Sequence, residues 1–199
     1  MATGSVTSGP AVAADAAIAG RAGVVRAGAA AGKYLTFQLD REEFGIGVLQ
    51  VREIMAVQDI TAVPQTADYV KGVINLRGKV IPVICLRTRF GLPAAAYGER
   101  TSIIVVDVRG QSGAMQVGII VDGVSEVLNV AAADIEPTPD FGGTAAPAYL
   151  LGMAKSKDRV KILLDIDQVA TASEVEALRS FRTTPETGGP GRTQDDAIQ

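Results

Sequence analysis

Histidine is absent from the 199-residue sequence. Its absence excludes every mechanism that uses an imidazole as nucleophile, general base, metal ligand or phosphoacceptor. The single cysteine, Cys85, cannot form a disulfide within the chain, which favours a reducing compartment. It lies in the apolar stretch Ile84-Cys85-Leu86 with no histidine to activate it, so we expect a buried structural thiol.

Basic runs and long apolar runs are also missing. The net charge is −3, which gives no electrostatic footprint for nucleic acid and no clustered attraction to anionic lipid. No apolar run approaches the roughly 20 residues of a membrane span, and the N-terminus lacks the basic and apolar regions of a signal peptide. We therefore expect a cytoplasmic protein that neither binds nucleic acid nor inserts into a membrane.

Three regions differ in composition. Residues 1–32 are rich in Ala and Gly without an apolar period, and residues 183–199 are rich in Gly, Thr and Pro. Neither region could bury enough apolar surface to offset its backbone entropy, so we predict disordered tails at 1–32 and 183–199. The folded domain is then 33–182, with a short C-terminal helix at 173–178, where Ser173 and Glu176 have capping-box spacing.

Alternation with a period of two dominates the folded region, as in residues 34–39, 115–121 and 160–166. Residues 80–86 and 101–108 are apolar on both faces, which is typical of strands covered on two sides. The sequence predicts a mostly β protein of closed or nearly closed antiparallel barrels. One short amphipathic helix is expected at 48–55. The predicted core includes Val80, Val83, Val105, Ile119 and Leu164.

No catalytic, metal-binding or cofactor-binding set emerges from the residues. Asp107 ends an apolar run, as the phosphoaccepting aspartate of a receiver domain does, but the alternating helices of a receiver are missing, so a turn is favoured. Gly45-Ile46-Gly47 lacks the third glycine of a dinucleotide site and is interpreted as a bend from a strand into the helix. Asp165 and Asp167 are expected on the solvated face of a strand.

The stretch VINLRGKVIPV, residues 73–83, places Arg77 between two apolar runs. A guanidinium at the tip of an apolar hairpin serves no core and must be hydrated or paired. We therefore expect Arg77 to be exposed at a turn.

Several motifs, in order, resemble the CheW family of chemotaxis coupling proteins over about residues 33–170. The matching segments are YLTFQLDREEFGIGVLQVREIM, YVKGVINLRGKVIPV with LRTRFGL, VGIIVDGVSEVL and YLLGMAKSKDRVKILLDID. The resemblance implies two five-stranded SH3-like barrels on a shared core, no enzymatic activity and no cofactor. It also implies an adaptor at receptor arrays on the inner membrane. Its expected partners are the CheW-like regulatory domain of the histidine kinase CheA and the cytoplasmic hairpin tip of chemoreceptors.

Positions of the family's interfaces carry over only where this sequence matches those motifs. The expected partner-binding residues are Val48, Val51, Glu53, Gly72, Arg77, Gly78, Gly118, Val124 and Val127. Glu53 is the candidate that orients Arg77. Cys85 departs from the family, in which many relatives have aspartate before Leu-Arg. Two alternatives remain: coupling in a chemosensory system that does not control flagella, and a regulator of the phospho-receiver type.

Overall fold

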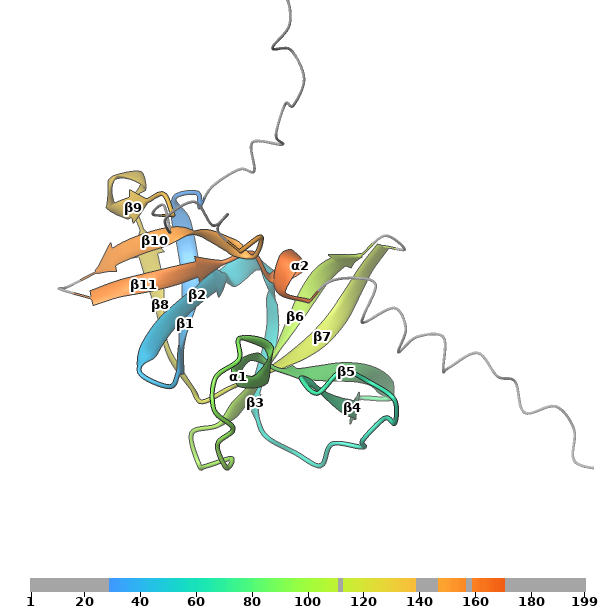
Figure 1. The fold of residues 1–199 in the computed structure, drawn as a ribbon. Helices are drawn as coiled ribbons and strands as arrows, with labels where there is room; N and C mark the ends of the chain where they lie inside the picture. Colours follow the sequence, from blue (N-terminus) through green and yellow to red (C-terminus); the bar gives the residue numbers. More distant parts are fainter. Residues whose placement is uncertain (1–28, 111–112, 139–146, 157–158, 171–199) are drawn as a thin grey trace, which may run out of the picture.

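The computed structural model describes residues 29–110, 113–138, 147–156 and 159–170, and the helix expected at 173–178 lies outside these residues. Figure 1 shows two sheets packed against each other. The six-stranded sheet contains, in spatial order, β8 (Gly123–Val130), β1 (Gly32–Leu39), β2 (Glu42–Gly47), β11 (Arg159–Leu164), β10 (Leu150–Ser156) and β9 (Ile135–Glu136). The five-stranded sheet contains β3 (Val51–Ala56), β6 (Ser102–Gly110), β7 (Gly113–Val121), β5 (Lys79–Cys85) and β4 (Val70–Leu76).

Helical structure in the described residues is limited to single turns. These are the 3₁₀ turns η1 (Val48–Gln50) and η2 (Ala132–Asp134) and the α-helical turns α1 (Leu86–Arg89) and α2 (Ile166–Val169). The predicted mostly β fold with two barrels is confirmed, and one of them has six strands where five were expected, because the two-residue strand β9 joins its edge. We call the six-stranded sheet the first barrel and the five-stranded sheet the second barrel.

The two barrels repeat one order of strand pairing. Each has a central antiparallel hairpin, β1–β2 or β6–β7, whose second strand pairs in parallel with β11 or β5. That parallel strand pairs antiparallel with the strand before it and continues into a single helical turn. The expectation of wholly antiparallel barrels is therefore wrong for two pairings, because the strand that returns from each outer hairpin closes the barrel alongside a strand of the same direction.

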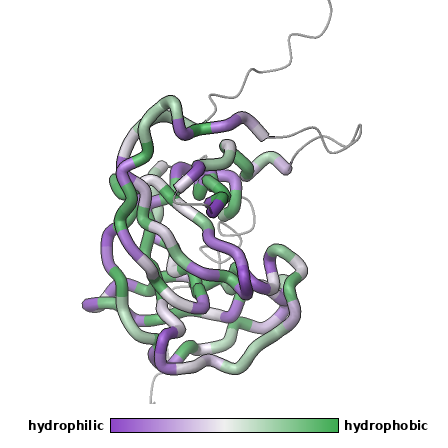
Figure 2. The backbone as a smooth tube through the Cα atoms, turned by 90° about the vertical axis from the view of Figure 1, so that its left-hand side faces the viewer, coloured by the Kyte–Doolittle hydropathy of each residue, from purple (hydrophilic) through white to green (hydrophobic). Residues whose placement is uncertain are grey.

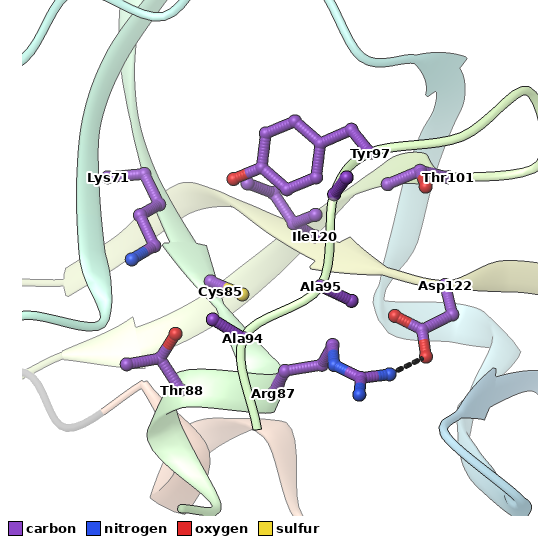
Figure 3. Close-up of a pocket in the computed structure, with 11 residues that line it drawn as sticks. Lys71, Cys85, Arg87, Thr88, Ala94, Ala95, Tyr97, Thr101, Ile120 and Asp122 are labelled. Carbon is purple, nitrogen blue, oxygen red and sulfur yellow. Dashed lines mark hydrogen bonds and ion pairs between the residues drawn. The ribbon is translucent and has the colours of Figure 1, made fainter. Parts of the chain in front are cut away.

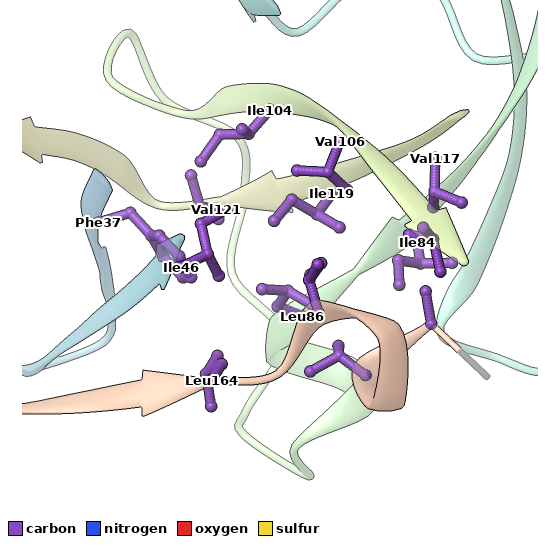
Figure 4. Packing of buried hydrophobic residues seen from close by; sticks show 14 of the residues in the cluster. Phe37, Ile46, Ile84, Leu86, Ile104, Val106, Val117, Ile119, Val121 and Leu164 are labelled. Carbon is purple, nitrogen blue, oxygen red and sulfur yellow. The ribbon is translucent and has the colours of Figure 1, made fainter. Parts of the chain in front are cut away.

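A shared core joins the barrels (Figure 4). Phe37, Ile46 and Leu164 from the first barrel meet Ile84, Ile104, Val106, Val117 and Ile119 from the second. Of the predicted core residues, Val83, Val105, Ile119 and Leu164 are fully buried. Figure 2 shows apolar and polar stretches interspersed along the chain.

Val80 is the wrong member of the predicted core, since it is 37% exposed. It pairs with Asn75 next to the β4–β5 turn, where the hairpin extends beyond the packed part of the sheet. Val160, at the equivalent place in the β10–β11 hairpin, is likewise exposed. Period-two alternation assigns a side chain to a face of the sheet, but not to a depth along the strand.

The folded unit begins before residue 33. Gly32 pairs with Val130, and the backbone N–H of Ala29 donates to the carbonyl oxygen of Leu151 at 3.1 Å. The Tyr34 hydroxyl donates to the carbonyl oxygen of Ala30 at 2.7 Å. The division into 1–32, 33–182 and 183–199 stays a prediction, but residues 29–32 belong with the barrels.

Candidate partner-binding site

Arg77 occupies the first central position of the two-residue turn between β4 and β5. Leu76 pairs with Lys79, and the φ angles of Arg77 and Gly78 are 51° and 82°. Two successive left-handed residues make a turn of type I′, which matches the twist of a hairpin. The Oδ1 atom of Asn75 accepts a hydrogen bond from the backbone N–H of Gly78 at 2.9 Å. Asn75 and Gly78 thus shape the turn and leave the Arg77 side chain in solvent.

Glu53 is the partner of Arg77 in the free protein, as the sequence indicated. The Nη2 atom of Arg77 donates to Oε1 of Glu53 at 3.0 Å, and the two side chains are 79% and 31% exposed. Glu53 comes from β3, at the opposite end of the strand order from β4, so the curl of the sheet brings the two together. An exposed pair of this kind contributes about 0–1 kcal/mol to stability, so its main effect is to position the guanidinium.

Residues 48–55 do not form the expected amphipathic helix. They form η1 followed by β3, which pairs antiparallel with β6 and has a register shift between Val51 and Glu53. Half-buried and exposed residues alternate regularly from Val51 to Ala56, so Val51 and Met55 are both half-buried at a spacing of four that a helix would share. Val48 adds a spacing of three because it lies in the 3₁₀ turn. Val48 and Val51 are half-buried, and Val51 packs against the shared core. A substitution at Val51 would therefore disturb the fold as well as any partner contact.

Two exposed apolar side chains of this region were missed in the sequence. Leu49 in η1 is 92% exposed and Ile54 in β3 is 45% exposed. Interpreting VREIM as a strand would have placed Ile54 on the face opposite Glu53. The helical interpretation concealed that signal.

Arg52 forms a second ion pair at the same end of the second barrel. Its Nε atom donates to Oδ2 of Asp107 at 2.6 Å, and its Nη2 atom contacts the same oxygen. This hydrogen bond lowers the pKa of Asp107 below its ordinary value, with further help from Gln116 and the charge of Lys79. Asp107 lies within β6, paired with Gln116, so the expected turn is wrong. The acidic cluster and flanking helices of a receiver site are not found among the described residues.

Gly72 and Gly118 are buried and serve packing. A Cβ atom on Gly72, whose φ is +137°, would lie 2.0 Å from the carbonyl oxygen of Thr61. One on Gly118 would lie 3.0 Å from Cγ2 of Ile103 and 3.2 Å from Cγ2 of Val83. Because neither glycine is exposed, we leave both out of the partner surface proposed below.

Val124 and Val127 lie on β8 in the first barrel, apart from the Arg77 turn. Val127 is 52% exposed, whereas Val124 packs against the shared core. Glu126, between them, contacts Lys161 at 3.5 Å, and Lys161 is buried at 2.8 Å from Glu43. The nine expected residues therefore divide into two surfaces and a buried remainder.

A cavity of about 110 Å³ lies beside α1, lined in part by Lys71, Cys85, Arg87, Tyr97 and Asp122 (Figure 3). Cys85 is 5% exposed, which confirms the expected buried thiol. It precedes α1 without capping it by a side-chain hydrogen bond, whereas Asp165 at the equivalent position of α2 accepts from the N–H of Asp167. Asp165 and Asp167 thus lie at a helical turn and not on a strand as expected.

Arg87 joins the two barrels at this cavity. Its Nη1 contacts Oδ2 of Asp122, its Nη2 lies 3.4 Å from Oδ1 of Asp40, and its Nε donates to the carbonyl oxygen of Pro93 at 2.9 Å. Asp40 and Asp122 lie at turns that flank strands of the first barrel. The Arg87 guanidinium is thus already bound to Asp40, Asp122 and Pro93. It stabilises the contact between the barrels and is not available as a reactive group.

A CheW-like domain model matches residues 33–174. The chain belongs to the CheW family of chemotaxis coupling proteins. It is 41% identical over 143 residues to the chemotaxis protein CheW of Klebsiella aerogenes, covering 72% of this chain and 84% of that protein. Identity to the chemotaxis protein CheW of Rhizobium meliloti is 36%, over 72% of this chain and 90% of the relative.

A solved structure shares the fold. The scaffolding protein TtCheW from Thermoanaerobacter tengcongensis superposes with a TM-score of 0.64 at 33% identity, over 73% of this chain and 97% of that one. Both comparisons agree with the resemblance carried by the NLRG and VDGVSEV motifs. In the described residues, no helix has the length and apolarity needed to cross a membrane.

Proposed function

We propose that this chain is a non-enzymatic adaptor that couples the cytoplasmic tip of membrane chemoreceptors to the regulatory domain of the histidine kinase CheA, at receptor arrays on the inner membrane. Membership of the CheW family supports the coupling role. The main observation in favour of this partner-binding site is the exposed guanidinium of Arg77, which lies in a type I′ turn and is oriented by Glu53. Gly78, Val48 and the outer part of Val51 complete this surface, and Val127 with Val124 forms a second surface on β8.

Two surfaces on two barrels suit a protein that holds two partners at once. The Arg77 turn belongs to the second barrel and β8 to the first. Arg87 and the shared core fix the barrels relative to each other. A rigid connection of this kind transmits the position of one bound partner to the other without a hinge.

The direct test is assembly of the complex from purified receptor cytoplasmic fragment, kinase and this chain. Arg77→Ala is expected to weaken assembly by on the order of 1–2 kcal/mol, as for an interfacial arginine near a hot spot. Lys155→Ala is the matched control, because Lys155 forms an exposed ion pair with Glu136 on the other barrel. Assembly unaffected by Arg77→Ala would contradict the proposal, and so would equal losses in both variants.

The non-enzymatic part has its own test. Incubation with labelled ATP, with and without kinase, is expected to leave this chain unlabelled and to change only the rate of kinase phosphorylation. Stable labelling at Asp107 would instead support a regulator of the phospho-receiver type.

A further inference from the structure

Three cations gather at the Arg77 end of the second barrel. Arg77 leads the β4–β5 turn, Lys79 follows it, and Arg52 projects from the bulge in β3. Lys79 pairs with Leu76 directly after the Arg77 turn, and its charge, like the bond from Arg52, favours the ionised form of Asp107. Only Arg77 was singled out by the sequence motif.

The cations are the outermost groups of this cluster. The Arg77 and Arg52 side chains are 79% and 58% exposed, whereas their partners Glu53 and Asp107 are 31% and 27% exposed. Lys79 is also exposed. An approaching molecule therefore meets three positive charges with two carboxylates beneath them, on a chain whose net charge is −3.

Both guanidinium groups keep unused donors. Arg77 bonds to Glu53 through Nη2, and Arg52 bonds to Asp107 through Nε and Nη2. The Nη1 atom of each has no acceptor among the described residues. Guanidinium groups with free N–H donors bind carboxylates in a fixed geometry, and charged hydrogen bonds are stronger than neutral ones.

The neighbouring apolar side chains narrow the choice of partner. Leu49 and Ile54 flank Arg52 in the chain and are exposed. The exposed groups named here are side chains, and the β4–β5 turn is closed by its own hydrogen bond. A helix suits such a contact, since its backbone groups are already paired and its surface can combine carboxylates with apolar residues.

We propose that Arg52 and Lys79 extend the Arg77 site into a three-cation surface that binds a carboxylate-bearing helical segment of the receptor, with Arg52 a specificity-determining residue. This inference rests on the proposed coupling function. Arg52 contacts the partner directly, and Asp107 competes with the partner's carboxylate for it.

The test compares Arg52→Gln with Asp107→Asn in the full chain, using the purified receptor cytoplasmic fragment as the probe. Arg52→Gln is expected to weaken binding about five- to tenfold, with a smaller salt dependence of the association rate. Asp107→Asn removes the charge that holds the guanidinium and is expected to leave affinity unchanged or raise it. Lys79→Gln is expected to have the same sign as Arg52→Gln with a smaller loss, and Lys155→Gln on the first barrel is the matched control.

The outcomes separate the two proposals. If the wild-type chain fails to bind the receptor fragment, the proposed function fails. If it binds and Arg52→Gln binds equally well, only the present inference fails. Equal losses in Arg52→Gln and Asp107→Asn would mean that the ion pair is structural and would also overturn it. A loss confined to kinase binding or to self-association would also overturn the inference, because the surface would then bind the kinase or a second copy of this chain and not the receptor.

Discussion

Arg77 occupies a backbone position that disfavours arginine. A φ of 51° costs an ordinary side chain about 1 kcal/mol, whereas Asn tolerates it, and Asn-Gly is the preferred pair of a type I′ turn. We therefore expect Arg77→Asn to leave the free energy of unfolding unchanged or to raise it by up to about 1 kcal/mol. The same substitution should weaken receptor–kinase assembly. Chemical denaturation and assembly measured on one preparation decide this. A destabilised variant with full assembly would show that Arg77 serves the fold.

The ion pair of Arg52 with Asp107 predicts a pH dependence. Because this hydrogen bond lowers the pKa of Asp107 in the folded protein, its stabilising contribution is present above the ordinary aspartate pKa of about 3.9 and is lost as the pH falls through the lowered value. Carboxyl NMR titration should find the pKa of Asp107 below that ordinary value in the wild type and closer to it in Arg52→Gln. An unchanged pKa in Arg52→Gln would contradict the assigned cause.

At the scale of the element, the sequence predicted strands well where alternation was regular. Residues 115–121 are a strand with Met115, Val117, Ile119 and Val121 buried, as the alternation indicates. The helix predicted at 48–55 was wrong because the spacing of Val51 and Met55 fits a regularly alternating strand as well as a helix, and the β-branched residues of this segment favour the strand. The bulge in β3 depends on pairing with β6, a distant partner that local spacing does not contain.

Gly72 shows how a strand can depend on a missing side chain. The Cβ atom of alanine at this position would meet backbone 2.0 Å away at a φ of +137°, whereas at Gly78, with φ +82°, it would meet nothing within 4 Å. We expect Gly72→Ala to lower the free energy of unfolding by more than about 3 kcal/mol, and Gly78→Ala by about 1 kcal/mol. Urea denaturation of both variants checks this order, and equal losses would contradict it.

At the scale of the molecule, the motifs predicted the family and the two barrels, but not how the site is assembled. Glu53 and Arg77 could be paired as a hypothesis because both lie in family motifs. Asp107 joins Arg52 because β6 pairs with β3, although the two residues are 55 positions apart in the chain, and Lys79 comes from β5, on the other side of β7 in the strand order. The parallel pairings of β2 with β11 and of β5 with β7 are equally non-local, and period-two patterns do not distinguish them from antiparallel ones.

The boundary of the folded unit can be measured by truncation. We expect a chain of residues 29–182 to melt and to bind the kinase like the full chain. A chain of residues 33–182 is expected to lose about 1–2 kcal/mol, because it lacks the backbone bond from Ala29 to Leu151 and the acceptor of the Tyr34 hydroxyl. Calorimetry on both decides the matter. Equal melting of the two would place the boundary at residue 33, and loss of kinase binding in residues 29–182 would give the tails a role in coupling.

The second barrel is inserted in the sequence between strands of the first, and this sets the order in which the two barrels can fold during synthesis. All strands of the second barrel lie between β2 and β8, so this barrel can close as soon as Val121 has left the ribosome. The β1–β2 hairpin is made first but waits for its parallel partner β11, which is complete only at Leu164. At about 5–20 residues per second the wait is on the order of ten seconds. Throughout it, Phe37 and Ile46 lack the Leu164 side of their core. The strands that are made first are therefore the ones that stay open to a chaperone longest.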